Sequence, residues 1–234
     1  MTSALKGFPE KFPVRDDDRR PVRYRIASVV GRVYLSLLSR RRLRVEGEHN
    51  IPAAGPLLVA SNHLSNLDPI LFGAHFPRTL FAMAKREMFI NAPVSWFFAG
   101  CNCIPVDRTR ADRRAVTRAL DVLRQRGRLL IFIEGTRSRD GTMTRAEAGI
   151  GFLARRSGAP VLPVAISGTG HAENPRGWLR RGQIVLRYGA PFTLDLSGRR
   201  DDSIIADEIA SRVAALLPPS HRGVYAGSMP PAAH

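Results

Sequence analysis

From residue 43 onward, short apolar runs alternate with segments in which apolar residues recur at the spacing of one helix face. The apolar runs predict six strands, at residues 57–60, 79–82, 103–106, 129–133, 161–166 and 184–188. The periodic segments predict four helices, at residues 66–76, 111–126, 146–157 and 201–217. Strands that alternate with helices are typical of a sheet covered on both faces. The sequence therefore predicts a single α/β domain over residues 43–217, with a mixed, mostly parallel sheet covered by helices.

An N-terminal amphipathic helix is predicted ahead of this domain, at residues 23–42. Arginines occupy one side of it, and the apolar face consists of Ile26, Val29, Val30, Val33, Tyr34, Leu37 and Leu38. This face can pack on the core, or it can lie in a membrane interface with the basic side toward the headgroups. Both alternatives remain open at this stage. Prolines and charges predict an irregular arm at residues 1–22, and glycine and proline predict a loose tail at residues 218–234.

The composition is strongly basic, with 36 lysines and arginines against 20 acidic residues and a formal net charge of +16. Such a charge attracts polyanions, which include acidic membrane surfaces, phosphorylated metabolites and nucleic acids. A nucleic-acid-binding module would interleave its basic face with aromatic side chains. Aromatic residues make up only 7% of the chain and cluster in apolar contexts. We therefore expect no nucleic-acid partner and keep that class as a remote alternative.

The sequence also suggests a compartment. No stretch reaches 18 consecutive apolar residues, and the first residues lack the apolar core of a signal peptide. The only two cysteines, Cys101 and Cys103, cannot close a structural zinc site by themselves and do not suggest a secreted disulfide framework. We therefore expect a protein of the cytosol, or of the cytosolic face of a membrane, without a metal.

The first candidate for chemistry is His63, which follows the apolar run at residues 57–60. In open α/β sheets, sites are usually built in the loop that leaves the carboxyl end of a strand. Ser65 and Asp68 have the spacing of a capping pair that opens the next helix. From the first turn, Asp68 could reach back to the imidazole, fix its tautomer and leave the other ring nitrogen free to accept a proton.

Three further stretches place polar groups directly after apolar runs. One run leads into Glu134-Gly135-Thr136-Arg137-Ser138, where glycine lets the backbone approach a ligand and arginine can hold a phosphate bidentately. Another run ends in Asp107-Arg108, and a third closes in Ser167-Gly168-Thr169. The simpler alternatives are a plain turn with solvated charges for the first and a local Arg108–Asp107 ion pair for the second.

Taken in chain order, the stretches at residues 61–69, 104–108, 134–138 and 161–169 resemble the first, second, third and fourth motifs of the glycerolipid acyltransferase family, which includes bacterial lysophosphatidate acyltransferases. The resemblance covers roughly residues 43–190, most of the chain. It implies that His63 is the catalytic base with Asp68 as its partner. It also implies an acceptor-phosphate site made of Arg108, Glu134, Gly135, Thr136 and Arg137. Two positions depart from the family pattern: Asn102 stands where a glycine is usual, and Glu147-Ala148 stands where many members have a lysine.

The resemblance further implies an O-acyltransferase that moves a fatty acyl chain from acyl-CoA or acyl-carrier protein to the free hydroxyl of a lysophosphatidate-type acceptor, making phosphatidate. No cofactor beyond the acyl thioester is implied. The alternative is the same chemistry on another polar lipid or glycolipid. Because such acceptors sit in the bilayer, we expect an anionic membrane surface as a partner and peripheral or monotopic attachment at the cytoplasmic face of the plasma membrane. The attachment would use residues 25–40 and the apolar segment 94–100.

Overall fold

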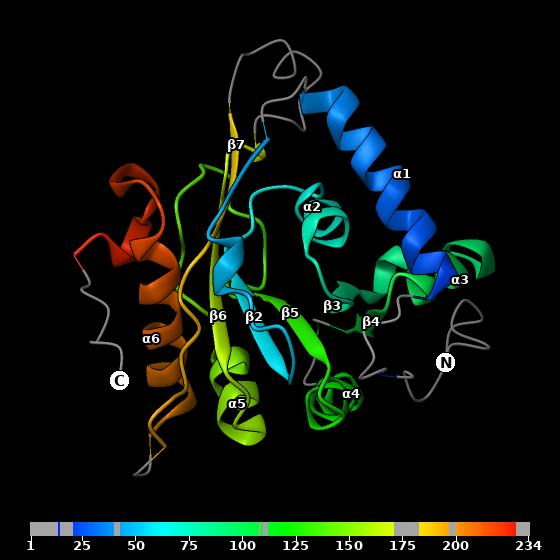
Figure 1. Ribbon diagram of the computed structural model, residues 1–234. Coiled ribbons are helices and arrows are strands. Elements are labelled where there is room, and N and C mark those ends of the chain that lie inside the picture. Colours follow the sequence, from blue (N-terminus) through cyan, green and yellow to red (C-terminus); the bar gives the residue numbers. More distant parts are fainter. Residues whose placement is uncertain are drawn as a thin grey trace.

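A seven-stranded sheet forms the centre of the molecule (Figure 1). The computed structural model describes residues 14, 21–39, 43–107, 109, 112–170, 183–196 and 200–227. The strands are β1 Leu43–Glu46, β2 Leu57–Ser61, β3 Leu80–Lys85, β4 Cys103–Val106, β5 Arg128–Phe132, β6 Val161–Ser167 and β7 Ile184–Tyr188. Their order is β1-β7-β6-β2-β5-β3-β4, and every neighbouring pair is parallel except β6 with β7. The predicted α/β fold with a mixed, mostly parallel sheet is therefore confirmed.

Helices cover both faces of this sheet, as Figure 1 shows. They are α1 Val22–Ser39, α2 Asp68–His75, α3 Ala92–Gly100, α4 Arg113–Arg124, α5 Ala148–Ser157 and α6 Asp202–Ala215. Short 3-10 turns complete the chain at Glu48–Asn50, Arg86–Met88, Pro219–His221 and Gly223–Tyr225. Among the described residues, no helix combines the length and apolar character that crossing a bilayer would require.

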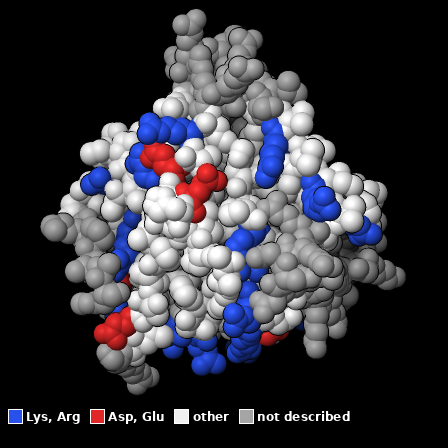
Figure 2. All heavy atoms as spheres, in the orientation of Figure 1, with Lys and Arg blue, Asp and Glu red and all other residues white. Residues whose placement is uncertain are grey.

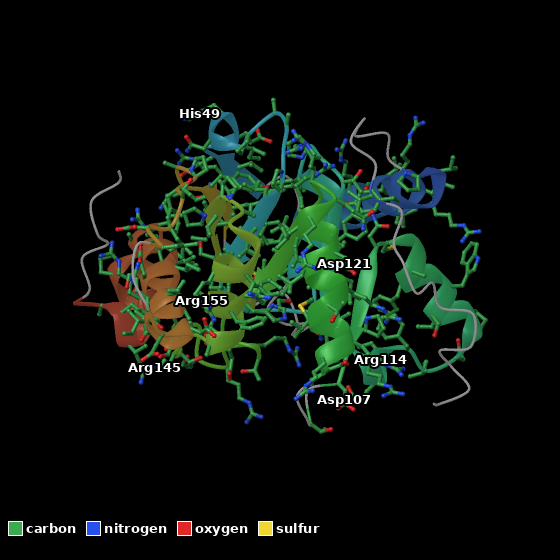
Figure 3. All side chains as sticks on the ribbon, turned by 90° about the horizontal axis from the view of Figure 1, so that it is seen from below. His49, Asp107, Arg114, Asp121, Arg145 and Arg155 are labelled. Carbon is green, nitrogen blue, oxygen red and sulfur yellow. The ribbon has the colours of Figure 1, made fainter. Side chains whose placement is uncertain are left out.

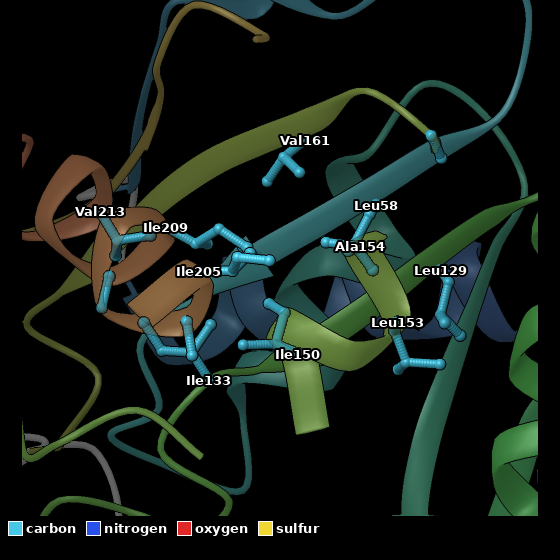
Figure 4. Close-up of a cluster of buried hydrophobic side chains, with 14 of the residues drawn as sticks. Leu58, Leu129, Ile133, Ile150, Leu153, Ala154, Val161, Ile205, Ile209 and Val213 are labelled. Carbon is cyan, nitrogen blue, oxygen red and sulfur yellow. The ribbon is translucent and has the colours of Figure 1, made fainter. Parts of the chain in front are cut away.

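Two hydrophobic clusters lie on opposite faces of the sheet, and β2 contributes to both. Leu58 and Ala60 belong to the cluster under α4, α5 and α6, whereas Leu57 and Val59 belong to the cluster under α1 and α2. All five residues of β2 are buried, because a strand covered on both faces has no solvent side. Figure 4 shows the first cluster, in which α5 and α6 pack on the sheet through Ile150, Leu153, Ile205, Ile209 and Val213.

Helices α5 and α6 also approach each other closely. A Cβ at Gly151 would collide with the Asp202 backbone, so glycine permits this approach. At the rim, the Arg155 guanidinium pairs with Asp202 at 2.7 Å and Arg145 pairs with Asp207 at 2.9 Å. Figure 3 labels both arginines on this side of the domain.

Most predicted elements lie where the sequence placed them. The strands at 103–106 and 184–188 match their predicted bounds, and the other four predicted strands and the four helices predicted within the domain shift by one to three residues at their ends. The predicted N-terminal helix begins at Val22, one residue before its predicted start. Two elements were missed. Strand β1, with the sequence LRVE, is a partly exposed edge strand with charges inside it. Helix α3 is so apolar along its length that it shows no helical period.

The C-terminal segment corrects one prediction. Residues 218–227 do not form a loose tail, because Tyr225 is buried and its hydroxyl donates to Asp207 Oδ1 at 2.7 Å while accepting the Ala146 N–H at 2.9 Å. Residues 228–234 lie outside the described residues, as does the predicted irregular arm apart from Val14, Pro21 and Val22.

The orientation of α1 decides between the two alternatives for its apolar face. Four residues of the predicted stripe, Ile26, Val29, Val30 and Val33, are each more than half exposed. The opposite face packs on α2 instead: Ser28 Oγ donates to the Gly73 carbonyl at 2.8 Å, and Arg32 Nε donates to the Ala74 carbonyl at 2.6 Å. These four stripe residues therefore do not pack on the core, and α1 is held on the domain by its other side, where Tyr24 and Leu35 are buried beside the hydrogen-bonding Ser28 and Arg32.

Candidate active site

The site lies where strands β2, β5 and β6 end. These three neighbours are parallel, so their carboxyl ends meet at one edge of the sheet. The segments that follow them begin with Asn62, Ile133 and Gly168, and together they hold three of the four predicted motifs. Sequence segments about seventy and a hundred residues apart are thus brought together by strand order alone.

The centre of the site is a hydrogen-bonded pair formed by His63 and Asp68. His63 Nδ1 lies 2.8 Å from Asp68 Oδ2. The same oxygen accepts the backbone N–H groups of Leu64 at 2.7 Å and Ser65 at 2.8 Å. Because an ionised carboxylate can only accept, Nδ1 is the donor, and Nε2 is left able to take a proton.

The position of Asp68 explains how a carboxylate can be buried there. Its side chain is fully buried, at the first residue of α2, where the positive end of the helix dipole favours a negative charge. Only one of the two hydrogen bonds of the predicted capping pair is present. The Asp68 carboxylate accepts the Ser65 N–H, but Ser65 Oγ accepts the N–H of Leu67 rather than that of Asp68. The helix therefore begins at Asp68, two residues later than predicted.

The imidazole of His63 is also held on one face. The ring of Phe132 stacks on it with centroids 4.0 Å apart and planes inclined by 17°. Phe132 is directly opposite Ser61 in the β2–β5 ladder, which carries its side chain to the turn that holds His63. Sequence reasoning missed this residue, and its only signal was its place at the end of an apolar run next to the third motif.

Glu134 is turned into the protein. Its side chain is buried, Oε1 accepts the His63 N–H at 3.2 Å, and Oε2 accepts the N–H and hydroxyl of Thr144 at 2.8 and 3.0 Å. Burial raises the pKa of this carboxyl, while the hydrogen bonds from Thr144 and His63 pull the pKa back down. Both carboxylate oxygens are thus engaged by the protein's own donors.

The rest of the third motif wraps around the same turn. Gly135 has φ +67°, and a Cβ there would come within 3.0 Å of the Glu147 side chain, so the turn requires glycine. The Ser138 N–H donates to the His63 carbonyl at 2.8 Å. Thr136 and Arg137, between these anchors, are exposed beside the His63 turn. The two ends of the motif thus hold both backbone groups of His63.

The fourth motif is joined to the first through Asn62. The buried Asn62 amide donates to the Ile166 carbonyl at 2.9 Å and accepts the Ile166 N–H at 2.8 Å, which extends the β2–β6 pairing by one side chain. The chain then turns at Gly168, with φ +85°, as the sequence predicted. Asn62 is therefore a second residue whose part in the site only the structure reveals.

The second motif is described only in part. Strand β4 delivers Asp107, which accepts the N–H and hydroxyl of Thr109 at 3.1 and 2.6 Å. Asp107 lies at the same end of the domain as Arg114 in Figure 3. Arg108 lies outside the described residues, so its predicted phosphate contact has no structural counterpart here. Asn102 has φ +57°, a left-handed conformation that asparagine tolerates where glycine is usual.

The two cysteines lie away from this site, at the start of β4, which is at the edge of the sheet opposite the carboxyl ends of the strands. Burial raises the pKa of the Cys101 thiol to about 11 and raises the pKa of the Cys103 thiol further. Both are therefore protonated at neutral pH, and a protonated thiol is a poor nucleophile.

The fold is that of the acyltransferase family. The family model described as Acyltransferase matches residues 42–167, more than half of the chain, and the chain belongs to this family. A solved structure, the 1-acyl-sn-glycerophosphate (LPA) acyltransferase PlsC from Thermotoga maritima, superposes with a TM-score of 0.66 at 28% identity, covering 80% of this chain and 76% of that one. The resemblance to glycerolipid acyltransferases is thus confirmed.

Curated relatives point the same way. A chloroplastic 1-acyl-sn-glycerol-3-phosphate acyltransferase of Arabidopsis thaliana is 25% identical over 77% of this chain and 50% of its own length. The Saccharomyces cerevisiae 1-acyl-sn-glycerol-3-phosphate acyltransferase is 30% identical over 65% of this chain and 52% of its own. The human alpha form is 32% identical over 58% of this chain and 49% of its own. The chain spans about half the length of these relatives.

Proposed function

We propose that this protein transfers a fatty acyl chain from a thioester donor to the free hydroxyl of a lysophosphatidate-type acceptor, making phosphatidate. The observation that carries the proposal is the His63–Asp68 pair, with Nε2 able to accept a proton at the carboxyl edge of the sheet. Relatives named 1-acyl-sn-glycerol-3-phosphate acyltransferases support the choice of acceptor.

The chemistry is a direct attack without an acyl-enzyme. Nε2 of His63 takes the proton of the acceptor hydroxyl while that oxygen attacks the thioester carbonyl. The carbon–sulfur bond then breaks, the sulfur of CoA or of the carrier protein takes the proton from the His63 imidazolium, and the free thiol leaves with His63 returned to its neutral form. Asp68 stabilises the imidazolium that forms in between. A positioned general base of this kind contributes a factor of about 10² to 10⁴ in rate.

The exposed Arg137 is the proposed contact for the acceptor phosphate, together with Arg108 and the backbone around Gly135 and Thr136. A guanidinium can hold phosphate oxygens with two parallel hydrogen bonds. Glu134 takes a different part in this proposal: its engaged carboxylate positions the His63 turn rather than contacting the ligand.

Arg137→Ala is expected to raise the KM for lysophosphatidate by about tenfold or more, because a charge-assisted phosphate contact contributes roughly 1.5 to 3 kcal/mol. Its kcat should fall less, and lysine should restore only part of the loss. Initial rates of acyl transfer over a range of acceptor concentrations measure this. The matched control is Arg124→Ala, which removes an exposed arginine at the opposite edge of the sheet. An unchanged KM in Arg137→Ala would contradict the assignment.

A second acceptor class deserves the same assay because of Glu147. This acidic side chain lies against Gly135, beside the proposed phosphate site, and many family members carry a lysine just before the glycine that matches Gly149, where this chain has Glu147-Ala148. A negative charge there favours an acceptor without a terminal phosphate, such as a glycolipid. A matrix of donors and acceptors, with mass spectrometry and regiochemistry of each product, separates the two. Transfer to glycolipids but not to lysophosphatidate would replace the proposed acceptor and keep the chemistry.

We also propose that the protein attaches to the cytoplasmic face of the plasma membrane through α1 and α3. The exposed stripe of α1 is continued by the half-exposed Trp96 of α3, over whose ring the Arg23 guanidinium lies at 4.1 Å. Apolar side chains flanked by arginines are suited to the boundary of anionic headgroups and acyl chains. On the face drawn in Figure 2, the basic side chains stand in separate groups, several of them on the side where α1 lies.

Replacing Ile26 and Val30 together with serine is expected to weaken vesicle binding by about tenfold or more, since burying each side chain is worth roughly 1.5 to 3 kcal/mol. Co-sedimentation with anionic and neutral vesicles, at low and high salt, measures this. The matched control, Ile204→Ser with Val224→Ser, removes two equally exposed apolar residues elsewhere. Wild-type vesicle binding by the α1 variant would contradict attachment through the stripe. Equal binding of the wild-type protein to neutral and anionic vesicles would contradict the proposed contribution of the arginines.

A further inference from the structure

Phe132 contacts both His63 and Phe72, a residue of the helix that begins at Asp68. Its ring stacks on the imidazole with the centroids 4.0 Å apart, and Phe72 meets it edge-on with the centroids 6.2 Å apart and the planes at 67°. Phe72 is fully buried and belongs to α2, the helix whose first residue is Asp68. The aromatic ring of Phe132 is therefore held by contacts with the base and with the helix that carries Asp68, the partner of the base.

A hydrogen bond to Asp68 does not by itself fix the imidazole. The bond to Nδ1 defines one edge of the ring, but the second side-chain torsion of histidine is broad, so the ring plane can tilt about that bond. The Phe132 stack removes this freedom because a tilted imidazole would meet the aromatic ring. Only 12% of the His63 side chain is exposed, so the stack leaves little more than one edge of the imidazole accessible.

We propose that Phe132 is a positioning residue for acyl transfer. Its ring fixes the plane of the His63 imidazole, while the hydrogen bond between Nδ1 and Asp68 fixes one edge of the imidazole ring. The inference rests on the proposed function. A cation is attracted to the face of an aromatic ring. The stack is therefore stronger once His63 has taken the proton than before, and interactions that strengthen toward the transition state raise kcat.

If Phe132 only filled space in the core, the expected effects of replacing it on stability and turnover would differ. If Phe132 only occupied space, an aliphatic side chain of similar size would cost stability and leave turnover unchanged in the folded protein. If it sets the imidazole plane, the same change lowers kcat without changing the KM for the acceptor, since the acceptor phosphate is held elsewhere. Tyrosine keeps the aromatic face and should rescue turnover.

The test compares Phe132→Leu, Phe132→Met and Phe132→Tyr with Phe76→Leu, a control that removes a fully buried ring packed on Tyr188. All are assayed well below their melting temperatures. We expect kcat to fall by about tenfold or more in the leucine and methionine variants, because misplacing a catalytic group by 1 Å can cost about 10². The KM should stay constant, and tyrosine should retain most of the activity. The Phe76 variant should lose stability and keep its kcat.

Nuclear magnetic resonance supplies the second readout. The aromatic ring current shifts the ring protons of a stacked histidine upfield, so the His63 signals, assigned by their loss in His63→Gln, should move downfield in Phe132→Leu and stay in Phe132→Tyr. Wild-type kcat in the leucine or methionine variant, or a loss in tyrosine as large as in leucine, would overturn the proposal. Wild-type turnover of His63→Ala would instead remove the proposed function itself.

Discussion

His63→Ala is expected to lower kcat by at least about 10², the usual contribution of a positioned general base. Asp68→Ala should be nearly as severe, because without the carboxylate the imidazole loses the acceptor that fixes Nδ1–H and stabilises the imidazolium. The two residues act as one unit, so the double variant should be little worse than His63→Ala alone. Single-turnover rates with saturating acceptor measure all three.

The control for this experiment is folding. Asp68 Oδ2 also accepts two backbone N–H groups, so its removal leaves buried donors without an acceptor and lowers stability. Thermal melts of each variant separate this from a catalytic loss, and rates are compared only below the melting transition. Additive losses in the double variant, or near-wild-type turnover of His63→Ala, would remove His63 from the role of base.

Glu134→Ala is expected to destabilise the domain by about 2 to 3 kcal/mol and to lower activity together with stability. Three buried or partly buried donors, the N–H of His63 and the N–H and hydroxyl of Thr144, would lose their acceptor. Of the two hydrogen bonds to the His63 backbone, only the one from the Ser138 N–H would remain. Urea denaturation and kcat measure the two effects, and Glu48→Ala, an exposed glutamate at the opposite edge of the sheet, is the control. Unchanged stability would show that Glu134 does not anchor the turn.

The pH dependence of stability gives an independent check on Glu134. Burial raises the pKa of this carboxyl in the folded state above its ordinary value near 4.5. Between the two pKa values the folded state binds more protons than the unfolded state, so the free energy of unfolding falls as pH rises. The contribution is present below about pH 4.5 and is lost as pH rises through the folded pKa. Glu134→Gln should abolish this part of the pH dependence.

The local sequence determined most of the elements because burial on both faces produces readable patterns. Strand β2 is a continuous apolar run, and α4 and α6 have the period of a helix with one buried face. Glycine and polar residues directly after such runs marked the turns at residues 62–68 and 134–138. The pairing of His63 with Asp68 followed from a strand, a turn and a capping spacing, all of which are local.

What only the tertiary structure decided depends on strand order and on which side of an element meets another. The order of β2, β5 and β6 places Phe132 on His63 and Asn62 on Ile166, and no pattern along the chain specifies which strands are neighbours. Likewise, the period of α1 showed an apolar stripe, but it did not show whether the stripe faces the domain or the solvent. The side of α1 that carries glycine and hydrogen-bonding residues packs closely on α2, because small residues allow a close approach and the carbonyls at the end of α2 need hydrogen-bond donors. The exposed residues of the apolar stripe are therefore left facing outward.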